Sequence, residues 1–278
     1  MYEEIIYDVS GPVATLRMNR PNQLNALTSL MLDEIRHALD QAERDEQVVG
    51  IVLTGEGRGF CAGMDMNALN EEAHSGKSSL GGERDHLKAN PGDPSMGEDF
   101  QITFAYLLSI RKPLIAAING PCAGLGMSIA LLCDLRYAAE NAKFTTAFSQ
   151  RGLVAEHGQS WILPRVIGPA RALDLLWSSR KFNGIEAEKL GVVNRALPQE
   201  EVLPAAQAYI QELAETAAPI SLKIMKQQVY RHLNMTLGEA MNETNRLMAE
   251  SLTRPDFKEG VTSFIEKRPP QFTRVKID

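Results

Sequence analysis

Two glycine-rich turns could each present a main-chain N–H group to a ligand. In the first, residues 57–65 (GRGFCAGMD), the glycines permit backbone geometry that a Cβ atom would hinder, so that Met64 offers an inward amide. The second, residues 118–127 (INGPCAGLGM), leads into an apolar run expected to be a buried helix, whose first amides, that of Leu125 among them, would be unpaired and polarised by the helix dipole. Two such amides converging on one carbonyl oxygen would stabilise negative charge that develops there.

Either turn alone is more often the simple end of a strand than a catalytic feature, so the argument depends on the pair. The segment Gly124-Leu125-Gly126 does not match the GxGxxG dinucleotide fingerprint or a P-loop. A nucleotide-binding interpretation is therefore not favoured for these turns.

Four blocks of sequence occur in the order and spacing of one known family. They are NRPNQLNAL (19–27), GRGFCAGMD (57–65), KPLIAAINGPCAGLGMSIALLCDLRYA (112–138) and EGVTSFIEKRPPQF (259–272). Through them the chain resembles the enoyl-CoA hydratase/isomerase (crotonase) superfamily over nearly its whole length. The resemblance implies an α/β fold, a crotonase-like spiral of ββα units with two roughly perpendicular sheets, and a C-terminal helical trimerisation region. It also implies an oxyanion hole made by Met64 and Leu125, and trimers that commonly pair into hexamers.

The same resemblance implies a site for the coenzyme A part of an acyl-CoA substrate, so no separate cofactor is expected. The residues expected near the CoA moiety are Asn22, Gln23, Leu24, Ala62 and Asp65. Phe264 and Lys267 are expected to reach toward it, in some members from an adjacent subunit. Lys267 would pair with a CoA phosphate, or else be a solvated lysine of a charged C-terminal helix.

Hydratases of this family carry two catalytic glutamates, and this sequence has neither. Aligning the blocks puts Ser128 and Phe148 at those positions. One acid is nearby, Glu156, in the turn RGLVAEHGQSWILPR (151–165). Members that resemble Δ3,Δ2-enoyl-CoA isomerases place a single catalytic glutamate in this turn. The resemblance therefore favours Glu156 as the base of an enoyl-CoA isomerase.

A single carboxylate suits a double-bond shift, because one base can take a proton from one carbon and return it to another on the same face. An apolar pocket would raise the pKa of Glu156 toward the useful range. The residues expected to furnish that pocket are Met64, Met66, Leu153 and Trp161. The alternative for Glu156 is a residue at a helix start, with His157 as its hydrogen-bonding partner.

Three other functions fit the same residues. A hydratase would recruit a second acid from residues 70–99, for example Glu71, Glu72 or Asp99. A hydrolase of thioester or carbon–carbon bonds would use the same oxyanion hole with water activated by Glu156. A non-catalytic acyl-CoA binder or oligomeric scaffold would bind the thioester without exchanging its α-protons.

Short β-branched runs and helical periodicity predict the elements that position these groups. Strand signals stop after Pro198, which divides the chain into an α/β core (1–198) and a helical region (199–278) that folds over its own core or packs on a neighbouring subunit. Residues 70–99 are rich in Gly, Ser, Pro and charge, and are expected to be a mobile surface segment, either a disordered insertion or a lid. Strands are expected at 5–7, 13–18, 48–54, 114–118, 135–139, 143–144 and 192–193, and helices at 28–44 with Thr28 as N-cap, 127–133, 202–216, 220–233 and 237–252.

Composition limits the partners of this chain. Its 278 residues carry a formal net charge of -6, with a sequence pI of about 5.5, which argues against nucleic acid as a partner. The apolar runs are too short to span a membrane, and the acidic N-terminus does not resemble a secretory signal, so a cytoplasmic enzyme is expected. The three cysteines and five histidines show no spacing typical of a metal site, and none is expected.

Overall fold

A computed structural model describes residues 2–75 and 84–277 of the chain. The strands in this part form two sheets. The larger sheet has six strands in the order β1-β2-β3-β4-β6-β9. The first two form an antiparallel hairpin, as the sequence predicts, and each later neighbour pairs in parallel. These strands are β1 (Ile5–Ser10), β2 (Val13–Met18), β3 (Gly50–Gly55), β4 (Leu114–Ile118), β6 (Leu135–Ala139) and β9 (Arg195–Leu197). The smaller sheet consists of β5 (Cys122–Ala123), β7 (Lys143–Thr145) and β8 (Phe182–Asn183).

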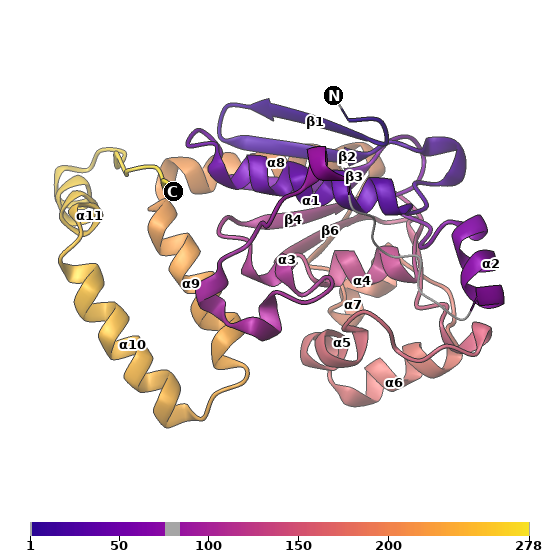
Figure 1. The fold of residues 1–278 in the computed structure, drawn as a ribbon. Helices are drawn as coiled ribbons and strands as arrows, with labels where there is room; N and C mark the ends of the chain where they lie inside the picture. Colours follow the sequence, from indigo (N-terminus) through magenta and orange to yellow (C-terminus); the bar gives the residue numbers. More distant parts are fainter. Residues whose placement is uncertain (1, 76–83, 278) are drawn as a thin grey trace.

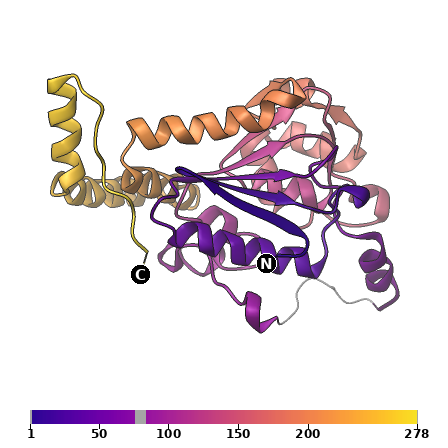
Figure 2. The same ribbon diagram turned by 90° about the horizontal axis from the view of Figure 1, so that it is seen from above.

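The larger sheet is covered on both faces, as its apolar central strands require. Every residue of β3 and β4 is buried. Figure 2 shows α1 (Ser29–Arg44) and α8 (Gln199–Thr216) on opposite sides of this sheet. Thr28 is the N-cap of α1, because its hydroxyl accepts a hydrogen bond from the Met31 amide at 3.0 Å.

The remaining helices connect and extend these layers. They are α2 (Met66–Ser75), α3 (Tyr106–Ser109), α4 (Leu125–Leu131), α5 (Gln159–Ile167), α6 (Pro169–Ser178), α7 (Gly184–Leu190), α9 (Pro219–His232), α10 (Leu237–Leu252) and α11 (Pro255–Glu266). Short 3-10 helices are η1 (Pro21–Gln23), η2 (Asp85–Leu87), η3 (Pro94–Met96), η4 (Glu98–Phe100) and η5 (Ser149–Arg151). The seven residues of α4 are all buried, as predicted for the helix that follows the second glycine-rich turn.

The strand predicted at Val192–Val193 is wrong. Both residues are buried, but they lie in the turn after α7, where their amides donate to the Ala187 carbonyl at 2.8 and 3.3 Å. These bonds satisfy a carbonyl at the end of the helix instead of forming a ladder. The last strand of the sheet, β9, begins at Arg195.

The segment from Arg84 to Phe100 packs on the core, which differs from the expected surface insertion. Leu87, Met96 and Phe100 are buried, and Arg84 forms an ion pair with Asp33 of α1. Residues 76–83 of the expected mobile segment lie outside the described residues. The part that is described forms part of the fold.

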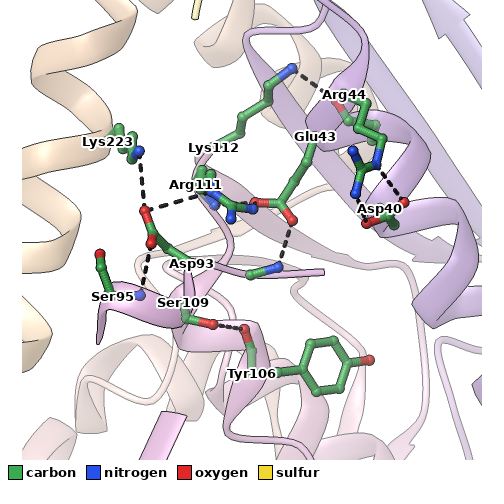
Figure 3. A network of polar contacts seen from close by, with 12 residues as sticks. Asp40, Glu43, Arg44, Asp93, Ser95, Tyr106, Ser109, Arg111, Lys112 and Lys223 are labelled. Carbon is green, nitrogen blue, oxygen red and sulfur yellow. Dashed lines mark hydrogen bonds and ion pairs between the residues drawn. The ribbon is translucent and has the colours of Figure 1, made fainter. Parts of the chain in front are cut away.

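A buried carboxylate, Asp93, joins this segment to α9 (Figure 3). Its oxygens lie 3.1 Å from the Lys223 ammonium and 2.7 Å from the Gln227 amide nitrogen, both on α9. The Ser95 amide also donates to it at 3.0 Å, and the Arg111 guanidinium lies 3.6 Å away. Burial alone would raise the pKa of Asp93, but the hydrogen bonds from Ser95 and the charge of Lys223 outweigh it and lower the pKa to about 2.

This ion cluster predicts a pH-dependent contribution to stability. Because the folded pKa is depressed, the contribution is complete above about pH 4 and is lost as the pH falls toward 2. Asp93→Asn is expected to lower the free energy of unfolding at pH 7 by about 1–2 kcal/mol, and the difference from the wild type should disappear by about pH 2. Urea denaturation followed by circular dichroism measures this, with the exposed Asp85→Asn as control. A difference that stays constant from pH 6 to pH 2 would contradict the assignment.

The C-terminal helices divide into a part on the core and a part away from it. α8 packs on the six-stranded sheet and buries Val202, Ala206 and Ile210. Figure 1 shows α10 and α11 projecting away from the sheet. Every residue of α10, all of them described, is at least partly exposed. The apolar side chains of Leu237 and Met248 are among those exposed there.

Candidate functional site

The two glycine-rich turns lie against each other and leave two amides without acceptors. Leu27 forms a bridge with the first turn, in which the Leu27 amide donates to Gly63 at 2.8 Å and the Asp65 amide donates to Leu27 at 3.0 Å. Within residues 2–75 and 84–277, neither the Met64 nor the Leu125 N–H donates a hydrogen bond. A Cβ atom built on Gly63 would stand 3.6 Å from the Leu125 nitrogen, so the two turns bring these N–H groups into one neighbourhood. This arrangement is suited to a developing oxyanion.

Main-chain contacts fix the two turns to each other. The Phe60 and Cys61 amides both donate to the Pro121 carbonyl, at 3.1 and 3.0 Å, and the Ala123 amide donates to Cys61 at 3.0 Å. A side chain at Gly126 would meet the Cys61 carbonyl oxygen at 2.5 Å. Glycine is therefore required for this close approach.

Glu156 lies in the turn between η5 and α5, beside the second glycine-rich turn. The N-cap of α5 is Gly158, which places Glu156 two residues outside the helix rather than at its cap position. Its carboxylate is 31% exposed, and one oxygen lies 3.6 Å from Nε2 of His157. The Gln159 side chain, three residues on, donates to the Gly124 carbonyl at 3.2 Å and so ties this turn to the one that carries Leu125.

A half-open cavity of about 570 Å³ lies next to the Glu156 turn. His157 and Trp161 line it from that side, and the Phe104 ring packs edge-on against the His157 ring at 5.3 Å. The other lining residues are Asp99, Phe100, Ile102, Thr103, Ala105, Leu108, Leu132, Gly158 and Asn234. The mixture of aromatic, aliphatic and a few polar groups is typical of a small-molecule site.

The cavity differs in part from the pocket expected around Glu156. Among the described residues, Trp161 lines it, but Glu156 itself and the other residues expected around it, Met64, Met66 and Leu153, do not. Met66 is 70% exposed on α2, and Leu153 is also exposed. Of the acids considered for a second catalytic role, Asp99 lines the cavity and Glu71 is exposed on α2, whereas the side chain of Glu72 lies outside the described part of the structure. No pattern in the sequence predicts a role for Asn234, which lines the cavity from the turn between α9 and α10.

Comparison with known proteins decides the family. Residues 8–275 match the family model described as enoyl-CoA hydratase/isomerase. The chain belongs to the enoyl-CoA hydratase/isomerase family. It is an acyl-CoA enzyme of that family, and its α/β fold matches crotonase-fold structures, as the sequence predicts.

Similar members of this family have names that indicate different reactions. The chain is 34% identical over 276 residues to 1,2-epoxyphenylacetyl-CoA isomerase of Escherichia coli, covering 98% of this chain and 99% of the relative. It is 29% identical over 265 residues to short-chain-enoyl-CoA hydratase of Clostridium acetobutylicum, covering 95% of each. A crystal structure of enoyl-CoA hydratase from Bacillus anthracis superposes with a TM-score of 0.83 at 26% identity, covering 98% of this chain and 99% of the other.

In this enoyl-CoA hydratase/isomerase family member, the first set of residues predicted to lie near CoA is adjacent to the Met64 turn. Asn22 and Gln23 belong to η1, and the Leu24 carbonyl accepts a hydrogen bond from the Ala62 amide at 3.0 Å. The buried Asp65 carboxylate is hydrogen-bonded to other parts of its own chain. It accepts from the Arg20 guanidinium at 2.9 Å and from the Asn67 amide at 3.0 Å. These bonds hold the start of α2, so contact with CoA stays a prediction for Asp65.

The second predicted set lies elsewhere in the same chain. Phe264 is 85% exposed on α11, and Lys267 is an exposed residue at the end of that helix. Figure 1 shows α11 at the opposite end of the molecule from α2. One chain therefore does not bring Phe264 and Lys267 to the turn that contains Ala62.

The described residues give no sign of a metal centre or a membrane span in this family member. Within them, no group of three or more His, Cys, Asp or Glu side chains could hold a metal ion. Burial raises the pKa of the Cys61 and Cys133 thiols to about 12, which disfavours a reactive thiolate. In the same part of the chain, no helix is long and apolar enough to cross a bilayer.

Proposed function

We propose that this enzyme shifts the double bond of an unsaturated acyl-CoA through a thioester enolate. The amides of Met64 and Leu125 would stabilise the enolate oxygen, and Glu156 would move the proton. The observation that carries the proposal is the pair of N–H groups of Met64 and Leu125, which have no acceptor among the described residues and lie in two adjoining turns. A partly exposed carboxylate, Glu156, lies in the segment that Gln159 ties to the second of these turns. Coenzyme A enters as part of the substrate, and no other cofactor is invoked.

The surroundings of Ser128 and Phe148 support a single-base reaction. Both side chains are buried, and neither is a carboxylic acid. The Ser128 hydroxyl donates a hydrogen bond to the Gly124 carbonyl at 3.4 Å and accepts one from the Gln159 amide nitrogen at 3.0 Å. A single base that removes and returns a proton on one face needs no second carboxylate. The relative at 34% identity is named 1,2-epoxyphenylacetyl-CoA isomerase, a name that denotes isomerisation of an epoxide and not a double-bond shift.

Hydration of an enoyl-CoA is the second candidate, because Asp99 lines the same cavity as His157. A water molecule activated between Asp99 and Glu156 would add across the double bond. Several relatives are named as hydratases, which is consistent with this reaction. The product distinguishes the two, since hydration yields a hydroxyacyl-CoA and isomerisation yields only a second enoyl-CoA.

We also propose that the working enzyme is a homo-oligomer, a trimer or a dimer of trimers. Phe264 and Lys267 are exposed and distant from the Ala62 turn of their own chain, so a neighbouring copy would supply them to the CoA moiety. The exposed apolar residues of α10 and α11 would lie between copies. An acyl-CoA complex in which a single chain surrounded the whole CoA moiety would contradict this arrangement.

Deuterium exchange tests the proposed chemistry. After incubation with 3-enoyl-CoA in deuterated water, mass spectrometry should show a 2-enoyl-CoA product with deuterium at C4, where the base returns the proton, and deuterium at C2 of the recovered substrate. Saturated acyl-CoA and phenylacetyl-CoA, which cannot isomerise, should still exchange at C2 if they fit the cavity. Tight binding with every C2 proton retained would favour a non-catalytic binder, and release of free CoA thiol would favour a hydrolase. Either result would contradict the proposal.

A further inference from the structure

The Gly124 carbonyl and the Leu125 N–H belong to the same peptide group. Because a trans peptide is planar, the direction of this C=O fixes the opposite direction of the N–H. Gly124 has φ 52° and ψ -121°, a conformation that residues with a side chain rarely adopt. The orientation of the peptide that offers the Leu125 amide must therefore be held by contacts on its carbonyl side.

Three donors meet the Gly124 carbonyl. The Ser128 amide donates at 3.1 Å, which is an ordinary helical bond. The other two come from side chains, the Gln159 Nε2 at 3.2 Å and the Ser128 hydroxyl at 3.4 Å. Gln159 Nε2 also donates to the Ser128 hydroxyl at 3.0 Å, and both side chains are completely buried.

Gln159 keeps this position at a cost to folding. Of the buried polar side-chain atoms in the described part of the chain, only Gln159 Oε1 and Arg17 Nε lack a hydrogen-bond partner. An unpaired buried acceptor destabilises a fold, and an apolar side chain of similar size would avoid that cost. Rotating the amide by half a turn would set its oxygen against the Gly124 carbonyl oxygen, so the donor must face Gly124. A role in packing alone does not explain a glutamine here.

We propose that Gln159 is a positioning residue for the reaction, and that it acts together with Ser128. Hydrogen bonds to the Gly124 carbonyl both orient the peptide and polarise it, which makes the Leu125 N–H a stronger donor to the thioester oxygen. The effect is largest in a buried site, where solvent screens little. This inference rests on the proposed function, because it assumes that the Leu125 amide meets that oxygen.

The test compares Gln159→Met with the wild type. Methionine keeps the length of the side chain and removes the donor. The C2 exchange rate at saturating acyl-CoA is expected to fall about tenfold, while KM changes by less than about threefold, because the donor matters most when charge develops. Ser128→Ala, a smaller change in the same network, should lower the rate in the same direction by a smaller factor. Gln207→Met is the matched control, since it removes a partly buried amide that donates to Thr15 of β2.

Infrared spectroscopy of a bound acyl-CoA labelled with 13C at the carbonyl separates positioning from a structural role. The wild type should lower the carbonyl stretching frequency relative to free acyl-CoA, and Gln159→Met should reverse part of that shift. If the wild type causes no shift, the proposed function itself fails. If the wild type causes a shift that both Gln159→Met and Ser128→Ala retain in full, Gln159 does not position this peptide and only the further inference fails.

Discussion

Replacing Glu156 by glutamine is expected to slow exchange of the acyl-CoA C2 proton by about a thousandfold, which is within the range for loss of a general base. Glutamine has nearly the same shape but does not accept the proton. The oxyanion amides and the cavity stay in place, so the dissociation constant for a saturated acyl-CoA should change by less than about threefold. Exchange is measured by mass spectrometry in deuterated water, and binding by isothermal titration calorimetry.

The matched control for this change is Glu98→Gln. Glu98 is an exposed acid of η4, next to Asp99 at the cavity. The Glu98 variant should exchange at the wild-type rate. The assignment of Glu156 would be wrong if Glu156→Gln exchanged normally. Loss of hydroxyacyl-CoA formation in both Glu156→Gln and Asp99→Asn would instead identify the hydratase reaction.

Gly63→Ala is expected to reduce the exchange rate by about a hundredfold or more, comparable to the loss of one oxyanion donor. Gly63 has φ 100°, which an L side chain rarely adopts. The added methyl group would stand 3.1 Å from the Ala123 carbonyl oxygen and 3.6 Å from the Leu125 nitrogen. Relieving this close contact would move the Met64 turn relative to the Leu125 turn. The two N–H groups would then no longer point at the same oxygen.

Gly168→Ala provides the matched control for backbone strain. Gly168 has φ 81°, and a Cβ built there meets no atom within 4 Å. This variant should lose stability, as Gly63→Ala does, but retain exchange within about threefold of the wild type. Thermal unfolding and the exchange rate are measured on both. Equal losses of activity in the two variants would show that strain, and not the spacing of the turns, explains the effect.

The sequence predicted the elements whose signals are local. The spacing of apolar residues and the Thr28 cap predicted α1, and the predicted helix at 237–252 coincides with α10. Val192 and Val193 were misassigned because a buried β-branched pair has the same pattern whether it packs after a helix or within a strand. β5 and β8 have only two residues each, too few to show an alternating pattern.

In the candidate site, too, the features with a local sequence signal were predicted and the long-range contacts were not. The need for glycine at position 63 is local, so the sequence pointed to the turns that carry Met64 and Leu125. The hydrogen bond between Gln159 and Gly124 joins residues 35 positions apart, and no pattern in either segment predicts it. The cavity likewise combines residues 99–108 with Asn234, which only the folded chain brings together.

A crystal structure with bound acyl-CoA tests the central claim most directly. The thioester oxygen should lie about 2.7–3.1 Å from both the Met64 and the Leu125 nitrogen, with the Glu156 carboxylate facing the C2 carbon. A thioester oxygen bound to other donors, or a Glu156 side chain turned toward bulk solvent in that complex, would contradict the account.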